Sequence, residues 1–457
     1  MKLIIDKLEK SFANSPARIS IIGYAALIVS GSFLLWLPVS ASRHIQFVDA
    51  LFTAASAVCV TGLTSVDTAT TFTLFGKIVI LGLIQVGGIG IMVLSTLFLF
   101  SIGKKISLNG KLLLKDTYNL SGGKGTLSLV KDIVLFTAVI ESIGAVVLFS
   151  RFSSGQTTGM GIFYCVFHSV SAFCNAGFSL FSDSFTGYSH DWILNLTIST
   201  LIILGGIGFV VLFEIKNFLF SRRHLPHLSL HTKLVLSSTA ILLFVSTAAF
   251  FLLESGNTLK GMTILYKFLA SFFQSVNART AGFNTVQMGD LTNETLLLTI
   301  ILMFIGAAPG SCGGGIKVTT FSTMVILGVS RLAGRTSPQI FYRRISDESI
   351  AKAVSLIMVS FLAITIGIIL LQQTEIGEIS HQLSRGAFLE LIFENISAFG
   401  TVGLSTGVTP TLSVPGRLII VMMMFVGRLG PLVIAVAVSR RGAAKLYSYA
   451  QDEIMIG

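Results

Sequence analysis

Long stretches without Asp, Glu, Lys or Arg recur along the whole chain and dominate its pattern of apolar and polar positions. A helix that crosses a bilayer needs about 20 mostly apolar residues. Six stretches without charge reach this length: Ile19–Ser42, Ile78–Gly103, Trp192–Phe213, Leu234–Leu253, Thr295–Ile316 and Ala353–Thr374. Two more carry one charge each, Ile133–Ser150 with Glu141 and Leu418–Ser439 with Arg428. The pattern therefore predicts eight membrane spans.

The composition supports a membrane protein. Hydrophobic residues make up 53% of the 457 residues and charged residues 12%, and the mean hydropathy is +0.84. A soluble globular protein carries about 25% charged residues, so this chain has too few to form a polar surface in water. The same numbers exclude a disordered chain. Four Cys in apolar segments, without metal-like spacing, favour neither a disulfide framework nor a zinc site.

The basic residues are concentrated on one side of the predicted membrane. Of the 32 Lys and Arg, 22 lie near the N-terminus, in the links after the second, fourth and sixth spans, or in the C-terminal tail. The positive-inside rule places this side, with both termini, in the cytoplasm. The net charge of +11 therefore reflects topology, and we expect no nucleic-acid partner. The basic links also suit anionic membrane lipid.

Four segments between the paired spans resemble one another: Asp49–Thr68, Tyr164–Ser184, Lys267–Gln287 and Glu390–Pro410. Each has an amphipathic run of about three turns, followed by a single Gly and an apolar residue. The four Gly are 115, 105 and 121 residues apart, and such a period indicates an internal repeat. We expect repeats at residues 1–120, 121–230, 231–350 and 351–457, the last including the C-terminal tail.

Each repeat is interpreted as a helix, a re-entrant pore helix with its loop, and a second helix. About a dozen residues cannot cross a bilayer of about 30 Å, and non-helical backbone at membrane depth must line a water-filled path or be buried in protein. The predicted fold is an all-α integral membrane protein with eight spans and four re-entrant pore helices around one central pore. The C-terminal ends of the four short helices would favour a cation there.

The residues around each Gly are the candidate selectivity filter. Successive carbonyls point to one side when left- and right-handed dihedrals alternate, and only Gly adopts positive φ at little cost. Carbonyls arranged in this way replace the hydration shell of an ion. An ordinary loop glycine is the alternative at any one site, but four in register favour the filter. The candidate residues are Val60, Thr61, Gly62, Asn175, Ala176, Gly177, Thr280, Ala281, Gly282, Thr401, Val402 and Gly403.

These motifs resemble the Trk/Ktr/HKT superfamily of potassium transporters. The resemblance rests on the fourfold plan, on VTGL, NAGF, RTAGFN and TVGL, and on GGIGIMVL and FVGRLGPL, and it covers about Arg18 to Gly457. With its short N-terminus, the chain looks most like the membrane subunit of bacterial Ktr systems. The loops differ from the TVGYG of tetrameric potassium channels, and one Gly per loop suggests one carbonyl site rather than four.

The resemblance implies several further properties. It implies potassium uptake across the bacterial plasma (inner) membrane, with K⁺ bound at the filter carbonyls. It implies a homodimer with one pore per protomer and a separate cytoplasmic ring of RCK-type subunits that binds ATP or ADP. This chain itself is expected to hold no cofactor. Any dependence on sodium is left open.

A break in the third repeat is the candidate gate. Gly306–Lys317 contains one Pro and five Gly in twelve residues, which disrupt a helix. The family places an intramembrane gate loop here, whereas a simple kink is the alternative. The gate residues are Gly306, Ala307, Ala308, Pro309, Gly310, Ser311, Cys312, Gly313, Gly314, Gly315 and Lys317, together with Arg428. We expect Arg428, a basic residue inside an apolar span, to line the pore or hold this loop through its carbonyls.

Five other features have simpler predictions. Gly87–Gly90 and Gly205–Gly208 indicate close helix packing. His168 is expected to be structural. Arg279 is expected to hold a pore helix, with Glu394 as a candidate partner. Glu141 is expected to pair with a neighbouring helix or lie near a helix end.

Two other classes of function fit the sequence less well. A proton- or Na⁺-coupled carrier of another small cation or solute often has inverted repeats, whereas these repeats are parallel and number four. A membrane enzyme is not expected, because HExxH and a GxSxG in a strand–helix context are absent from the sequence, as are paired intramembrane Asp or His.

Overall fold

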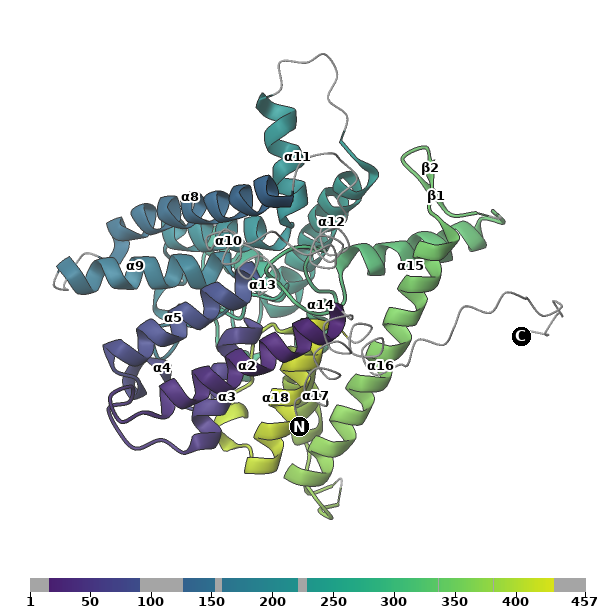
Figure 1. The fold of residues 1–457 in the computed structure, drawn as a ribbon. Helices are drawn as coiled ribbons and strands as arrows, with labels where there is room; N and C mark the ends of the chain where they lie inside the picture. Colours follow the sequence, from purple (N-terminus) through teal and green to yellow (C-terminus); the bar gives the residue numbers. More distant parts are fainter. Residues whose placement is uncertain are drawn as a thin grey trace, which may run out of the picture.

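The computed structural model describes residues 16–90, 126–152, 158–220, 228–335, 337–380 and 382–430. These residues are mostly helical, with one short antiparallel hairpin of β1 (Gln339–Ile340) and β2 (Arg343–Arg344) (Figure 1). The prediction of a helical fold is confirmed. The N-terminal start, most of the basic link after the second predicted span and the C-terminal tail lie outside the described residues.

Each quarter of the chain contains a long helix, a short helix, an extended loop and a further helix. The first contains α2 (Pro16–Trp36), α3 (Phe47–Cys59), α4 (Thr68–Thr71) and α5 (Leu74–Ile89). The second contains α8 (Thr126–Phe152), α9 (Thr158–Phe173), η1 (Thr186–Tyr188), α10 (Trp192–Gly206) and α11 (Phe209–Phe220). The third contains α12 (Leu230–Glu254), α13 (Ile264–Asn277), η2 (Met288–Asp290), α14 (Asn293–Phe304) and α15 (Val318–Leu332). The fourth contains α16 (Asp347–Glu375), α17 (Ala387–Gly400), η3 (Thr409–Thr411) and α18 (Val414–Leu429).

Polar residues placed just before the apolar runs start many of these helices. A side-chain oxygen at the N-cap accepts a hydrogen bond from a backbone N–H that has no partner within the helix. Thr73 caps α5 in this way, Ser229 caps α12 and Ser413 caps α18. The helix boundaries thus follow local chemistry as well as the apolar pattern.

Fewer helices than predicted are long enough to cross a membrane by themselves. Within the described residues, the helices of sufficient length and apolarity are α8, α12 and α16. The pair α10 and α11 qualifies as a fourth span if the two are taken together, but it bends by 101° at Ile207–Gly208. The predicted second and eighth spans continue outside the described residues, and the predicted sixth is interrupted because α14 ends at Phe304. The prediction of eight spans is therefore not confirmed by helix length.

The glycine pairs allow very close packing, as predicted. At Gly87 a Cβ would collide with the carbonyl of Val58, and at Gly205 with the carbonyl of Phe173. The chain also bends here, which was not predicted from the sequence. Gly208 has φ of +91°, in the left-handed region that favours glycine, and it separates α10 from α11.

The four short helices α3, α9, α13 and α17 lie in the interior. They contain 13 to 16 residues, so at 1.5 Å per residue each is about 20 to 24 Å long, shorter than a bilayer core. Each carries a fully buried aromatic side chain: Phe52, Phe167, Phe273 and Phe393, respectively. Each packs against the long helix that precedes it, α2, α8, α12 or α16.

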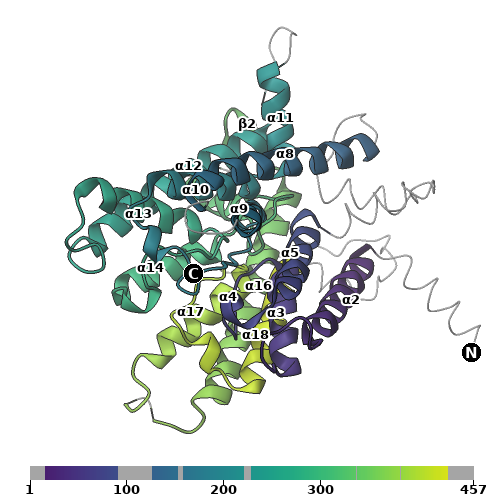
Figure 2. The same cartoon turned by 90° about the vertical axis from the view of Figure 1, so that its left-hand side faces the viewer.

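Contacts between the quarters close the structure into a ring. The helix that follows each loop packs against the short helix of the next quarter: α5 on α9, α10 on α13 and α14 on α17. The last of these contacts, α18 on α3, joins the end of the described chain to its beginning, and the two helices lie side by side in both views (Figures 1 and 2). The loops that follow the short helices are thereby brought to one centre.

Candidate functional site

The four loops share an alternating backbone conformation. The residue two before each predicted glycine is left-handed, with φ of 57° at Val60, 59° at Asn175, 69° at Thr280 and 49° at Thr401. The residue between is not left-handed, and the glycines are again left-handed. Their φ values are 98° at Gly62, 68° at Gly177, 79° at Gly282 and 91° at Gly403. This is the alternation that was expected to turn successive carbonyls to one side.

The sequence did not reveal that each loop begins with a left-handed residue that is not glycine. Such a conformation costs about 1–2 kcal/mol for an L-residue, and three of the four residues here are β-branched. Backbone strain of this kind persists only where the surrounding packing enforces it, and it is concentrated at functional sites. All four residues are fully buried.

The four glycines lie next to one another around one axis. A Cβ on Gly62 would lie 2.6 Å from the carbonyl oxygen of Ala176, the residue that precedes Gly177. The same relation links Gly177 to Ala281 at 2.7 Å and Gly282 to Val402 at 2.6 Å. Gly403 closes the ring against the carbonyl of Thr61. The structure thus brings all four predicted loops together, in chain order, in a glycine ring where side chains have no room.

Buried polar side chains behind the ring hold the loops, and sequence reasoning missed them. The Ser56 hydroxyl accepts a hydrogen bond from the Gly62 N–H (3.0 Å), and that of Ser397 accepts one from the Gly403 N–H (3.1 Å). Ser171 donates to the carbonyl of Phe178 (2.8 Å). A signal was available, because SAVCVTG, SAFCNAG and SAFGTVG place a Ser six residues before three of the four glycines.

The third loop is held differently, because it has one residue more between its Ser and its glycine. There the Asn277 side chain accepts a hydrogen bond from the Phe283 N–H (3.1 Å). The polar support of each loop is therefore local, supplied by the short helix that leads into it.

His168 has the structural role that was predicted. It is fully buried and stacks on Phe181, with ring centroids 5.1 Å apart and planes 13° from parallel. Its Nε2 accepts from the Leu180 N–H (3.1 Å), and its Nδ1 lies 2.8 Å from the carbonyl of Tyr164. The imidazole of His168 therefore holds the loop that follows Gly177 in place.

The predicted pairing of Arg279 with Glu394 is wrong. Arg279 follows α13 and donates to the Thr239 hydroxyl of α12 (3.3 Å), away from the fourth quarter. Glu394 faces the loop of its own quarter, where it accepts from the Thr409 hydroxyl. Glu141 pairs with a neighbouring helix, as predicted, since the amide of Gln85 on α5 donates to its carboxylate (3.1 Å).

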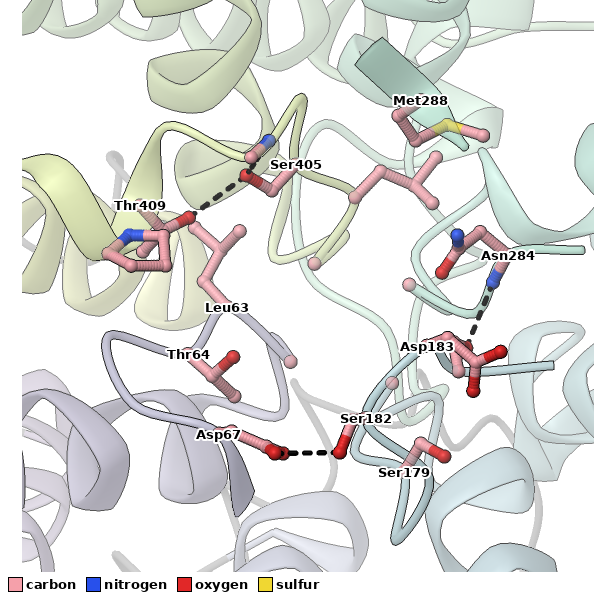
Figure 3. Close-up of a pocket in the computed structure, with 18 of the residues that line it drawn as sticks. Leu63, Thr64, Asp67, Ser179, Ser182, Asp183, Asn284, Met288, Ser405 and Thr409 are labelled. Atoms are coloured by element: carbon pink, nitrogen blue, oxygen red, sulfur yellow. Dashed lines mark hydrogen bonds between the residues drawn. The ribbon is translucent and has the colours of Figure 1, made fainter. Parts of the chain in front are cut away.

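On one side of the ring lies a cavity of about 400 Å³, here called the outer cavity, and Figure 3 shows residues that line it. All four ring glycines line it, together with polar residues of the following loops, among them Asp67 and Asp183. Burial alone would raise the pKa of Asp67. Hydrogen bonds from Ser182 (2.7 Å), Thr70 (2.8 Å) and the Ala69 N–H (2.9 Å) outweigh this effect, so the pKa lies below its ordinary value. A carboxylate thus remains charged at the cavity wall and attracts cations.

On the other side of the ring lies the predicted gate segment. It leaves α14 at Phe304 and rejoins helix at Val318, and its ends are tied by a hydrogen bond from the Gly306 N–H to the carbonyl of Ile316 (2.7 Å). It docks into the bend between α10 and α11. The Ala308 N–H donates to the carbonyl of Gly206 (2.9 Å), and the Phe209 N–H donates to that of Gly310 (3.0 Å).

The tip of this segment touches the strained residues beneath the ring. The Gly314 N–H donates to the Thr401 hydroxyl (3.0 Å), and a Cβ on Gly313 would collide with the side chain of Thr280. Two basic side chains hold the tip. Lys317 Nζ donates to the carbonyl of Gly313 (2.7 Å), and Arg428 donates to the carbonyls of Cys312 and Gly87. The predicted gate residues and Arg428 are therefore brought together directly below the ring.

Comparisons with known proteins agree with this architecture. A family described as TrkH, cation transport protein, matches residues 6–446. The chain is 40% identical over 459 residues to the Ktr system potassium uptake protein B of Bacillus subtilis, covering all of both chains. It is 37% identical to the potassium/sodium uptake protein NtpJ of Enterococcus hirae over 97% of each chain.

A solved structure has a similar fold. The structure of the potassium transporter TrkH from Vibrio parahaemolyticus superposes with a TM-score of 0.72, covering 92% of this chain and 83% of that one. Sequence identity between the two is 18%, so this likeness concerns the fold alone.

Proposed function

The chain belongs to the TrkH family of cation transport proteins, and from this membership we propose that it takes up potassium across a bacterial plasma membrane. The substrate is inferred from relatives that match over nearly their whole length and are named as potassium or potassium/sodium uptake proteins. The transporter carries an ion and catalyses no covalent chemistry.

The glycine ring is the observation that carries the proposed mechanism. K⁺ entering from the outer cavity exchanges its hydration shell for the carbonyl oxygens of the four loops. Two features support this role: the alternating dihedrals of each loop and the absence of side chains where the loops meet. The short helices that lead into the loops point their C-terminal ends, which carry partial negative charge, toward the bound cation.

The segment 306–317 acts as the gate in this proposal. Its tip lies against Thr280 and Thr401, directly below the ring, where it blocks the path of the ion. Arg428 stabilises this closed arrangement through the carbonyl of Cys312 and places a positive charge next to the path. Opening requires the tip to release these contacts and move aside.

The proposal also covers the oligomeric state, the partners and the membrane orientation of the protein. The protomer forms a homodimer with one pore per chain, in contact with membrane lipid, and both termini are cytoplasmic. A cytoplasmic RCK-type ring that binds ATP or ADP shifts the gate. The B. subtilis relative is named as protein B of a Ktr system, which supports a further component. Whether uptake depends on sodium is open in this proposal, and the name of the E. hirae relative, a potassium/sodium uptake protein, motivates a flux measurement with and without Na⁺.

Flux measurements in proteoliposomes test the function. We expect the purified protein to carry K⁺ and Rb⁺ down their gradients in the presence of an uncoupler, with Na⁺ carried more slowly. Adding the RCK ring should make the flux differ between ATP and ADP. Flux that an uncoupler abolishes would instead identify a proton-coupled carrier. No flux of any of these cations, from correctly folded protein, would refute the proposal.

A further inference from the structure

A second cavity of about 530 Å³ lies at the seam where the first and last quarters of the chain meet. Its walls come from the turn between α2 and α3, from the loop after the first ring glycine, and from the start of α18. Val66 lines both this seam cavity and the outer cavity, so the two lie beside each other on the same face of the protein. The ion path does not pass through the seam cavity, since none of the ring glycines lines it.

Two arginines give the seam cavity a net positive charge. Arg417 is matched by Asp49, the one acidic residue in the cavity lining, with Nη1 2.7 Å from Oδ1. Its Nη2 donates to the carbonyl of Pro410 (2.9 Å), and its buried Nε has no hydrogen-bond partner among the described residues. Arg43 donates to the neutral hydroxyl of Thr71 (2.9 Å) and forms no ion pair within the described chain. Its charge is therefore available to an anion.

Further donors face the same space. His44 lies in the lining beside Arg43. Gln46 stands at the N-cap of α3, and its side chain caps none of the first N–H groups of that helix. Guanidinium groups bind phosphate oxygens through several parallel hydrogen bonds, and the start of a helix adds partial positive charge. This chemistry suits a phosphate group better than a carboxylate-rich peptide or a metal cation.

Aromatic side chains place the seam cavity at the level of the lipid headgroups. The Trp36 and Phe33 rings pack against Phe47, at centroid distances of 5.7 and 5.6 Å, and all three remain exposed. Trp is enriched where the apolar membrane core meets water. On the other wall, Val414 and Leu418 are also exposed apolar residues. The cavity therefore has a polar floor and an apolar rim, which fits an amphiphile.

We propose that the seam cavity binds the phosphate of a membrane phospholipid, with its acyl chains on the exposed aromatic and aliphatic side chains at the rim. The placement of this face in the outer leaflet rests on the proposed function. Because no peptide bond joins the first and last quarters here, the bound lipid reinforces the contact between Arg417 and Asp49 and keeps the ring closed.

Thermal unfolding of the full-length protein in detergent tests this inference. The probes are phosphatidylglycerol, diacylglycerol and inorganic phosphate. Each is titrated into the wild-type protein and into the Arg43→Gln variant. Arg385→Gln serves as the matched control, because Arg385 is exposed and lies in the turn before the fourth short helix, away from the cavity. We expect phosphatidylglycerol to raise the Tm of the wild type and of the control. The half-saturating concentration should rise about tenfold in Arg43→Gln, since one charge-assisted hydrogen-bonded contact is lost.

The three probes separate the possible ligands. Diacylglycerol, which lacks the phosphate, should leave the Tm unchanged. The proposal would be overturned if diacylglycerol raised the Tm as much as phosphatidylglycerol does. It would also be overturned if Arg43→Gln and Arg385→Gln had the same half-saturating concentration of phosphatidylglycerol. A shift from inorganic phosphate that phosphatidylglycerol does not reproduce would also overturn it and identify free phosphate as the ligand. Because thermal unfolding does not depend on ion flux, the lipid-binding proposal and the potassium-transport proposal can be refuted independently.

Discussion

Replacing Gly282 by Ala tests the glycine ring most directly. Gly282 has φ of +79°, and a Cβ there would lie 2.6 Å from the Val402 carbonyl oxygen and 3.1 Å from the Gly403 Cα. Ordinary van der Waals contact begins at 3.4 Å, so the oxygen and the new methyl group must separate by about 0.8 Å. The left-handed conformation adds about 1–2 kcal/mol for Ala.

Gly261→Ala isolates the conformational cost. Gly261 has φ of +88°, but nothing lies within 4 Å of its added Cβ, and it sits in the turn between α12 and α13. Both variants therefore lose similar conformational free energy, whereas only Gly282→Ala displaces a carbonyl of the ring. Thermal unfolding should show a lower Tm for both variants than for wild type, and the decrease should be larger for Gly282→Ala.

The decisive assay is K⁺ and Na⁺ flux in proteoliposomes. A displaced carbonyl costs the ion a charge-assisted contact of about 1.5–3 kcal/mol, so K⁺ flux through Gly282→Ala should fall about 10- to 100-fold. Its preference for K⁺ over Na⁺ should fall as well, while Gly261→Ala should transport like wild type. Wild-type flux and selectivity in a correctly folded Gly282→Ala protein would show that these carbonyls do not bind the ion.

Three further predictions concern the gate and the outer cavity. Deleting Gly313–Gly315 should raise K⁺ flux without the RCK ring by about tenfold, because the tip contacts are lost; unchanged flux from folded protein would identify the segment as a kink. Arg428→Gln should also raise flux about tenfold through loss of its contact with Cys312, and Arg428→Lys should have a smaller effect; abolished flux in the Gln variant would indicate a structural role. Asp67→Asn should lower the Tm at pH 7. Since the folded pKa of Asp67 lies below its ordinary value of 3.8, its stabilising contribution is present above pH 3.8 and is lost as the pH falls through the folded pKa. The Tm difference from wild type, followed by calorimetry, should therefore shrink below pH 3.8, and a constant difference would contradict the role assigned to Asp67.

Local chemistry made much of this architecture predictable. Charge-free stretches located the apolar helices, since membrane spans permit few charges. The four glycines could be found because each occupies a backbone conformation that only glycine adopts cheaply. Gly306–Lys317 could be found because Pro and several Gly close together disfavour a continuous helix.

What the sequence did not reveal depends on contacts between distant segments. The left-handed conformation of Thr280 and Thr401 is enforced by packing, and no local preference of Thr indicates it. Arg279 and Glu394 were expected to pair because opposite charges attract, but each instead bonds to a hydroxyl within its own quarter, Arg279 to Thr239 and Glu394 to Thr409. The bend at Gly208 was missed because glycine serves both close helix packing and chain bends, so the sequence alone does not distinguish the two.

The closing of the glycine ring by Gly403 against Thr61 determines when during synthesis the ring can form. These residues are far apart in the chain, and Arg417 and Asp49, which meet at the same seam, are 368 positions apart. Contacts of such long range form late, because the loop-closure entropy must be overcome first. A nascent chain that holds only its first three quarters therefore lacks the contacts that complete the glycine ring. If the ring forms the ion pathway, as proposed, this pathway is complete only when the last quarter docks, and a partly synthesised chain has no closed pore for ions to cross.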